Sequence, residues 1–100
     1  MIDWEQIAGF DWAEGNARKN ADQHDVSQAE AEQIFFNEPL LMLPDIAHSV
    51  VEQRVHALGR TDDERLLHVT FMLRDSETKI RVISARDMSR KERSYYDQSA

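Results

Sequence analysis

The alternation of apolar and polar residues predicts a β-sheet in the second half of the chain. The clearest strand spans 65–74, where two sets of residues alternate at every second position: Leu67, Val69, Phe71 and Leu73 against Leu66, His68, Thr70 and Met72. A period of two places the two sets on opposite faces of a strand. Shorter apolar stretches predict further strands at 40–43, 54–58 and 79–85, the last with Ile80 and Val82 opposite Arg81 and Ile83. Because short polar turns separate neighbouring strands, we expect antiparallel hairpins.

Helices are predicted by three capping patterns, in which a short polar residue is followed three positions later by a carboxylate. The pairs are Asp11 with Glu14, Ser27 with Glu30 and Ser89 with Glu92. Each arrangement satisfies backbone N–H groups that the first helical turn leaves open. We therefore expect helices over 12–23 and 28–36, and a third that begins after Ser89.

The order of these elements is helix, helix, four strands and helix. It predicts an α+β fold of two layers, in which helices pack on one face of a four-stranded antiparallel sheet. At the end of the first helix, Asp25 is expected in the left-handed conformation that glycine adopts more easily. One hundred residues are enough for one such domain, 1–100, and too few for two.

Composition indicates an ordinary globular protein, because 41% of the residues are hydrophobic and 31% are charged. The longest apolar run, 40–43, is too short to span a bilayer, and the first residues do not have the pattern of a signal peptide. The chain has no cysteine, which excludes disulfides and thiolate metal sites. A small domain held without disulfides suits a reducing compartment, so we expect a cytoplasmic protein without membrane contacts.

Known signatures of metal and phosphate sites are missing from the sequence. The histidines are His24, His48, His56 and His68, and no two have the i, i+4 spacing of a helical zinc pair. His56 and His68 face each other if their strands form a hairpin, but no third ligand accompanies them. Isolated surface or edge histidines are the favoured interpretation. Without a glycine-rich phosphate loop or a GxSxG turn, we expect neither a metal nor another cofactor.

Positive charge is concentrated in one segment, 79–96, which we call the basic segment. It holds 6 of the 12 Lys and Arg residues and two acidic residues, so its net charge is +4, whereas the rest of the chain carries −11 and the whole chain −7. A local positive field attracts anions whatever the total charge of the protein. The candidate anion-binding side chains of this segment are Arg81, Arg86, Arg90, Lys91, Arg93, Tyr95 and Tyr96.

These side chains suit single-stranded RNA, because arginine binds phosphate through its planar fork and tyrosine stacks on bases. A plainer interpretation is a solvated helix face, in which the cations pair with acidic neighbours and the tyrosines pack on the sheet; those neighbours are Asp87, Glu92 and Asp97. Glu52 and Arg54, two positions apart, share one face of a strand and alone indicate a surface ion pair. The residues by themselves leave both interpretations open.

A resemblance to a known family covers nearly the whole chain. It is carried by FDW at 10–12, Asn20, His24-x-Val26, Ala31, IFF at 34–36, Glu52-x-Arg54, Gly59, Arg81-x-Ile83-Ser84-Ala85-Arg86 and Glu92-Arg93-x-x-Tyr96. In this order and spacing the chain resembles the BrnT family, the toxins of a type II toxin–antitoxin system. The resemblance implies a RelE-like fold and a metal-independent endoribonuclease that halts translation.

The same resemblance implies roles for particular residues. Arg54, Arg81 and Arg86 are expected to contact phosphate, Tyr96 and His24 to transfer protons or stack on bases, and Glu52 to orient Arg54 or act as a base. The further RNA contacts are expected from Arg90, Lys91, Arg93 and Tyr95. The implied partner is a BrnA-type antitoxin, in a heterotetramer with two toxins, and DNA is contacted only through that antitoxin.

Three positions depart from the family pattern. Asn16 and Gln23 stand where the family usually has lysine, and Asp25 stands where it usually has glycine. The chain has a net charge of −7, and these changes further weaken its attraction to RNA. The alternative is therefore a weakened or inactive relative that mainly binds its antitoxin. In either case we expect an apolar docking patch with a polar rim, to which Met42, Leu43 and Ile46 are candidates to contribute.

Overall fold

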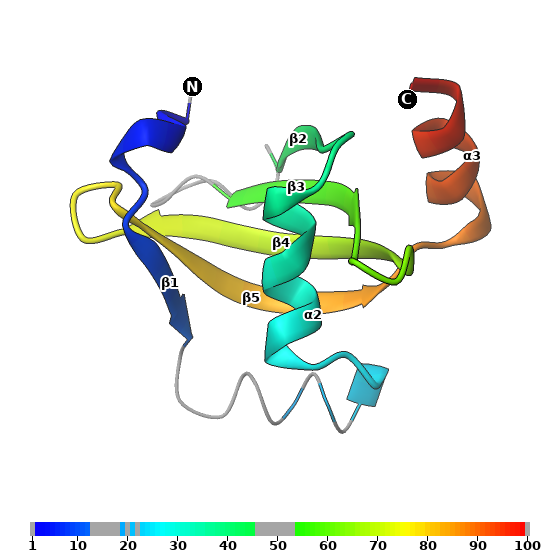
Figure 1. Ribbon diagram of the computed structural model, residues 1–100, viewed down its shortest axis with the longest axis horizontal. Coiled ribbons are helices and arrows are strands. Elements are labelled where there is room, and N and C mark those ends of the chain that lie inside the picture. Colours follow the sequence, from blue (N-terminus) through cyan, green and yellow to red (C-terminus); the bar gives the residue numbers. More distant parts are fainter. Residues whose placement is uncertain (1, 13–18, 20, 22, 46–53, 100) are drawn as a thin grey trace.

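The structure is a computed structural model that describes residues 2–12, 19, 21, 23–45 and 54–99 (Figure 1). The elements follow in the order η1 (Trp4–Gln6), β1 (Gly9–Trp12), α2 (Gln28–Gln33), η2 (Ile34–Phe36), β2 (Leu41–Asp45), β3 (Arg54–Arg60), β4 (Leu66–Arg74), β5 (Lys79–Asp87) and α3 (Arg90–Ser99). The four predicted strands are confirmed, although β2, β3 and β5 each end two residues later than expected.

The strands form one mixed sheet in the order β1-β5-β4-β3-β2. β1 pairs with β5 in parallel, whereas β2 with β3, β3 with β4, and β4 with β5 pair antiparallel. The α+β class is confirmed. The prediction of a four-stranded, purely antiparallel sheet is wrong, because Gly9–Trp12 adds a fifth, parallel strand at one edge.

Asp11 explains this correction. It was expected to cap a helix, but its backbone lies in β1 opposite Arg81, and its carboxylate accepts hydrogen bonds of 2.9 and 2.6 Å from the Arg81 guanidinium. The flanking aromatic residues Phe10 and Trp12 pack against the hydrophobic core. Charge-assisted hydrogen bonds and burial of two aromatic rings outweigh a helix cap. Trp12 therefore belongs to β1 and not to the predicted helix 12–23.

Only part of that predicted helix lies in the described part of the chain. Residues 19, 21, 23 and 24 are helical, whereas Glu14 and most of its neighbours lie outside the described residues. Asp25 follows with a φ of 54°, which confirms the expected left-handed conformation at the helix end.

The other two capping boxes are confirmed. The Ser27 hydroxyl accepts the Glu30 N–H at 3.1 Å and the Glu30 carboxylate accepts the Ser27 N–H at 3.0 Å, so α2 begins as predicted. At α3, the Ser89 hydroxyl accepts the Glu92 N–H at 3.2 Å, and Glu92 accepts the Ser89 N–H at 2.9 Å. None of the helices in the described part of the chain is long and apolar enough to cross a membrane.

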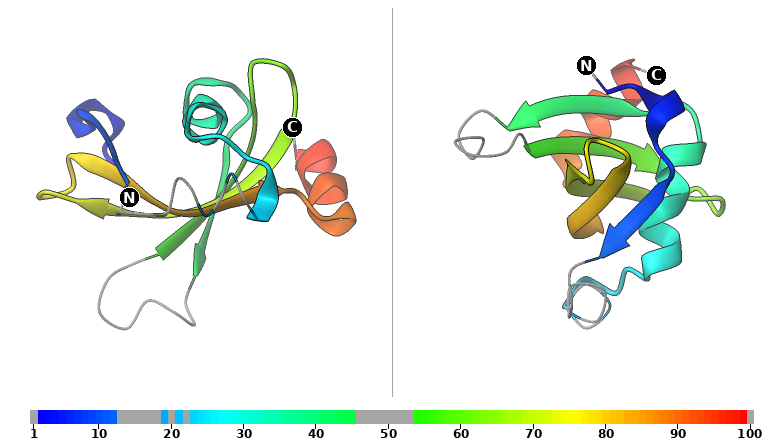
Figure 2. Two further views of the ribbon diagram at one scale, coloured as in Figure 1. Left: turned by 90° about the horizontal axis from the view of Figure 1, so that it is seen from below. Right: turned by 90° about the vertical axis from the view of Figure 1, so that its left-hand side faces the viewer.

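The main core lies between the sheet and α2, which covers one sheet face (Figures 1 and 2). The predicted alternation in β4 is confirmed, since Leu67, Val69 and Phe71 are fully buried on this face. They pack with Val26, Ala31, Ile34, Ala57, Ile80, Val82 and Ala85. The opposite side chains His68 and Thr70 are also buried, so β4 is a central strand covered on both faces.

A β-bulge in β5 decides which side chains share the second face. Thr70 pairs with Ser84 but Phe71 pairs with Val82, so Ile83 is an extra residue. Arg81 and Arg86 are five positions apart, and regular alternation would place them on opposite faces. The extra residue shifts the alternation by one, so that Arg81 and Arg86 face the same way. Both therefore point away from the face that α2 covers.

Candidate functional site

The sheet face opposite α2 gathers most of the polar side chains of the central strands. We call this the polar sheet face; the register places on it Arg54, His56, His68, Thr70, Arg81, Ser84 and Arg86. In the left view of Figure 2, α2 lies on one side of the sheet and α3 follows beyond the end of β5. Three arginines from two strands thus share this face with two histidines and two hydroxyls.

Arg86 is joined to α3 through Glu92. Its two terminal nitrogens donate to the two Glu92 carboxylate oxygens at 2.8 and 2.9 Å, and one of them also donates to the Asp87 carbonyl at 3.0 Å. Glu92 is at the same time the carboxylate of the α3 capping box with Ser89. The Arg86 hydrogen bonds, followed by the Ser89 N–H, lower the pKa of Glu92 to about 2. Glu92 is therefore a permanent carboxylate that holds the guanidinium in place.

His56 and His68 lie side by side beneath this ion pair. Their ring centroids are 4.8 Å apart, and His56 Nδ1 lies 2.9 Å from the Thr70 hydroxyl. His68 Nε2 lies 3.8 Å from a Glu92 oxygen. Burial, and next the positive charge of Arg86, lower the pKa of His68, so its imidazole is neutral at pH 7. The interpretation of these two histidines as isolated edge or surface residues is wrong, because the register of β3 and β4 puts both side chains on one sheet face with their rings 4.8 Å apart.

Arg81 has its counter-ion on β1. Its guanidinium donates twice to Asp11, and both side chains are about one-third exposed. The parallel edge strand therefore fixes the direction of Arg81 on the polar sheet face. Arg54, the first residue of β3, lies on the same face by register with His56. Glu52, its expected partner, lies outside the described residues.

Tyr96 is buried, with 4% of its surface exposed, and packs with Leu58 and Met88. Its hydroxyl donates to the Pro39 carbonyl at 2.5 Å, and burial raises its pKa. These contacts attach α3 to the sheet. For Tyr96, they agree with the plainer interpretation, in which the tyrosines pack on the sheet. Tyr95 is 47% exposed on α3, and the remaining cations of that helix, Arg90, Lys91 and Arg93, are exposed with it.

His24 lies in a different network, which is organised by Arg65. Arg65 donates to both Asp87 oxygens at 2.8 and 3.0 Å, to Glu30 at 3.1 Å and to the backbone carbonyls of Asp25 and His24 at 2.7 and 3.4 Å. The His24 side chain is exposed. We call this network the Arg65 clamp, because it joins the helical segment before α2 to β4 and β5. The structure does not bring His24 onto the polar sheet face.

Several residues of the polar sheet face and its edge carry no signal of a site in the sequence. The local pattern predicts a helix cap at Asp11, a strand position at Thr70 and isolated histidines at 56 and 68. Their proximity depends on strand pairing between residues far apart in sequence. The one local signal was the possibility that His56 and His68 face each other across a hairpin. Among the described residues, no group of three potential ligands is arranged to hold a metal ion.

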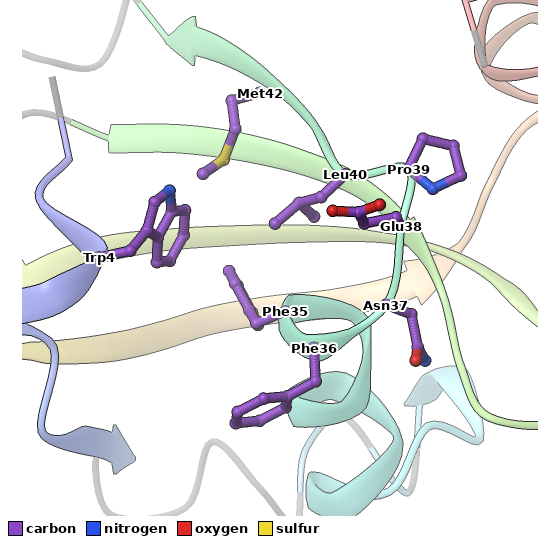
Figure 3. Close-up of a pocket in the computed structure, with 8 residues that line it drawn as sticks. All are labelled: Trp4, Phe35, Phe36, Asn37, Glu38, Pro39, Leu40 and Met42. Atoms are coloured by element: carbon purple, nitrogen blue, oxygen red, sulfur yellow. The ribbon is translucent and has the colours of Figure 1, made fainter.

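A second feature lies on the other side of the molecule. We call it the aromatic hollow: an open cavity of about 510 Å³ lined by Trp4, Phe35, Phe36, Asn37, Glu38, Pro39, Leu40 and Met42 (Figure 3). Met42 was expected in an apolar docking patch and does line this hollow. Leu43 is 39% exposed on the same strand, and Ile46 lies outside the described residues.

Comparisons with known proteins bear on both features. The family model described as the ribonuclease toxin BrnT of a type II toxin–antitoxin system matches residues 12–92. The crystal structure of the ribonuclease toxin BrnT of Brucella abortus matches with a TM-score of 0.62 and 21% sequence identity, over 82% of this chain and 97% of that one. At this identity the structural match shows a common fold. No curated protein matches the sequence. Because the family model covers most of the chain, the protein belongs to the BrnT family of ribonuclease toxins of type II toxin–antitoxin systems.

Proposed function

We propose that the protein is a metal-independent endoribonuclease of the cytoplasm, which cleaves RNA and so inhibits translation and growth. The polar sheet face is the proposed site. The observation that carries this proposal is the bulge at Ile83, which puts Arg81 and Arg86 on one face beside two histidines. A bulge is a means of redirecting a side chain without ending a strand.

The arginines are assigned to the phosphate. A metal-free ribonuclease must stabilise the extra negative charge that develops when the ribose 2′-hydroxyl attacks the adjacent phosphate. Arg86 keeps Nε, and Arg81 keeps one terminal nitrogen, outside the hydrogen bonds that they make to Glu92 and Asp11. We assign these remaining nitrogens to hydrogen bonds with a phosphate bound on the polar sheet face. Arg54 is assigned the adjoining phosphate contact.

Proton transfer is assigned to the histidine pair. The reaction needs a base for the 2′-hydroxyl proton and an acid for the departing 5′-oxygen, and imidazole serves both purposes near neutral pH. His56 is the more exposed of the two rings and is assigned the contact with the ribose. His68, neutral at pH 7 and close to Glu92, is assigned to the same proton-transfer step. Glu52 remains the proposed partner of Arg54.

The remaining expected residues take supporting roles in this proposal. The Tyr96 hydroxyl is engaged with Pro39, so we assign Tyr96 to positioning α3 and not to proton transfer. The exposed residues of α3 are assigned to the RNA strand that flanks the cleaved bond: Arg90, Lys91, Arg93 and Tyr95. His24 is assigned no chemical step, because its backbone belongs to the Arg65 clamp.

The test is cleavage of a labelled RNA by the purified protein in the presence of EDTA. We expect products that end in a 2′,3′-cyclic phosphate and a 5′-hydroxyl, and no cleavage where the 2′-hydroxyl is replaced by hydrogen. His56→Gln and His68→Gln are expected to lose most of the activity while they still bind RNA. Cleavage that requires a divalent cation, or that survives both histidine substitutions, would contradict the proposed mechanism.

A second candidate is the inactive relative that mainly binds its antitoxin. It is favoured by one observation, that Arg81 and Arg86 both already have a carboxylate partner in a chain of net charge −7. This candidate predicts that induced expression of soluble protein leaves growth unchanged, with or without the neighbouring gene. Growth arrest that the neighbouring gene relieves would favour the ribonuclease.

The partner is the cognate antitoxin that membership of a type II system implies. We propose that it is of the BrnA type, that two toxin chains bind it in a heterotetramer, and that DNA is contacted through the antitoxin alone. Light scattering on the co-purified complex measures the stoichiometry. A mass equal to one toxin and one antitoxin would contradict the heterotetramer.

A further inference from the structure

The aromatic hollow lies on the side of the sheet opposite the polar sheet face. Leu40, Met42 and Phe35, which line it, pack against the core on the α2 side of the sheet. In Figure 3, Trp4 on η1 faces Leu40, Met42 and Phe35 across the hollow, and the ring of Phe36, at the edge of the lining, is turned away from these four side chains. A molecule bound in the hollow would therefore leave Arg81 and Arg86 accessible.

Aromatic residues at this surface are exposed and lie next to further aromatic rings. Trp4 is 43% exposed and Phe36 is 78% exposed, although both are large apolar side chains. The Trp4 ring lies 6.2 Å from Phe35, and Phe35 lies 5.2 Å from the fully buried Phe71. Phe36 lies 6.1 Å from Phe10. Exposed aromatic rings beside an apolar cavity are typical of the anchor points of protein interfaces.

The lining of the hollow carries negative charge only. Glu38 is the single charged residue among the eight that line it, and we call it the acidic rim; the exposed residues Asp3 and Glu5 are the sequence neighbours of Trp4. None of the eight residues that line the hollow is lysine or arginine. An apolar cavity with negative charge at its edge favours a partner segment that carries an apolar side chain between cations. The net charge of −7 acts in the same direction.

We propose that the aromatic hollow and Phe36 bind the cognate antitoxin through a segment in which an apolar side chain is flanked by Lys or Arg. A hollow of about 510 Å³ is large enough for one large apolar side chain and part of its backbone. The family of the chain supplies the identity of the partner, and the acidic rim supplies its chemistry. The proposal rests on membership of a toxin–antitoxin family and is independent of RNA cleavage.

The first test measures the dissociation constant for the purified antitoxin encoded beside the gene. Trp4→Ala and Phe36→Ser are each expected to raise it about tenfold or more, as removal of an aromatic anchor does. Phe36 is mostly exposed, so Phe36→Ser keeps the test valid even if Trp4→Ala disturbs η1. The matched control is Tyr95→Ser, which removes an exposed aromatic ring from α3 and is expected to leave the constant within twofold. Unchanged binding by Phe36→Ser would overturn the proposal.

A second measurement locates the partner directly. Trp12→Phe leaves Trp4 as the sole tryptophan of the chain. When an antitoxin that contains no tryptophan is added to this variant, we expect the fluorescence emission of Trp4 to shift to shorter wavelength. We also expect acrylamide to quench this fluorescence less. No change at saturating antitoxin would place the partner elsewhere and overturn the proposal.

The charge part is tested by Glu38→Lys, with Asp97→Lys on α3 as the control for net charge. Glu38→Lys is expected to weaken binding several-fold and to reduce its dependence on salt, whereas Asp97→Lys changes neither. Equal effects of the two variants would overturn the role of the acidic rim. RNA cleavage is measured on the same proteins: loss of binding with unchanged cleavage supports two separate surfaces. Absence of cleavage by the unmodified chain contradicts only the proposed ribonuclease.

Discussion

The protein builds the same arrangement twice, with different consequences. At α2, Ser27 and Glu30 form a capping box, and Glu30 also pairs with Arg65. At α3, Ser89 and Glu92 form a capping box, and Glu92 also pairs with Arg86. In both cases a glutamate on the first turn of a helix holds an arginine: Arg65 directly before β4, or Arg86 within β5.

The two arginines differ in what else they contact. Arg65 donates to two carboxylates and two backbone carbonyls, and 26% of its side chain is exposed. Arg86 donates to one carboxylate and one carbonyl, is 40% exposed, and faces the histidine pair. A fully engaged guanidinium stabilises the fold, whereas a partly engaged one still has a donor for a ligand. The comparison therefore separates a structural clamp from a candidate binding group.

Among substitutions of these two arginines and their partners, the largest expected effect is on RNA cleavage. Arg86→Ala is expected to lower the cleavage rate about 100-fold, because it removes a donor aimed at the charge that develops on the phosphate. Its free energy of unfolding is expected to change by less than about 1 kcal/mol, since the pair with Glu92 is partly exposed. Single-turnover cleavage and urea unfolding measure the two quantities. A rate within threefold of the unmodified protein would remove Arg86 from the site.

Arg65→Ala is expected to do the reverse. Removing this guanidinium leaves two carboxylates and two carbonyls without their donor, which costs about 2.5 kcal/mol of unfolding free energy. Cleavage by the protein that remains folded is expected to be unchanged. Arg65→Lys keeps the charge but not the planar fork, so an intermediate loss of stability is expected. Loss of cleavage by folded Arg65→Lys would show that the clamp also serves the site.

The free energy of unfolding at low pH is expected to depend differently on Glu92 and Glu30. The pKa of Glu92 is lowered to about 2 by Arg86, and that of Glu30 is lowered chiefly by the Ser27 N–H. A carboxylate with a lowered pKa in the folded state contributes stability that is complete above its usual pKa of 4.5 and is lost as pH falls toward 2. Glu92→Gln is expected to destabilise the protein by about 1 kcal/mol at pH 7 and by less at pH 3.

The control is Glu30→Gln, which is expected to flatten the same pH dependence by a smaller amount. Urea unfolding at pH 7, 5, 4 and 3 measures both variants. An acid dependence in Glu92→Gln as steep as in the unmodified protein would exclude Glu92 as its source.

Capping boxes show what the sequence alone predicts well. Ser27 with Glu30 and Ser89 with Glu92 are local patterns, in which the interacting atoms lie within three residues of each other. The alternation in β4 is predicted for a similar reason, because burial imposes it residue by residue. These signals were sufficient for the α+β class and for four of the strands.

The features that build the site depend on contacts distant in sequence. Asp11 pairs with a residue 70 positions away, so its local pattern predicted a cap and missed the parallel strand. Alternation through 79–85 gives no sign that Ile83 is an extra residue, because the bulge is defined by the pairing with Thr70 and Phe71. The histidine pair likewise depends on the register of β3 and β4. The parallel strand, the bulge and the histidine pair therefore depend on long-range strand pairing, which local sequence patterns do not reveal.

The smallest expected effects come from the caps themselves. Ser27→Ala and Ser89→Ala each remove one side-chain acceptor from the first turn of a helix and are expected to cost about 1 kcal/mol of unfolding free energy. Their effects on cleavage are expected to differ. Ser89→Ala removes the acceptor of the Glu92 backbone N–H but keeps the Ser89 N–H that holds the Glu92 carboxylate. The loosened first turn, which carries Glu92, is expected to lower the cleavage rate severalfold. Ser27→Ala, matched in chemistry and stability, is expected to cleave RNA normally, because Glu30 pairs with Arg65 of the clamp and with no arginine of the polar sheet face. Equal cleavage by the two variants would mean that the α3 cap stabilises the helix without orienting the site.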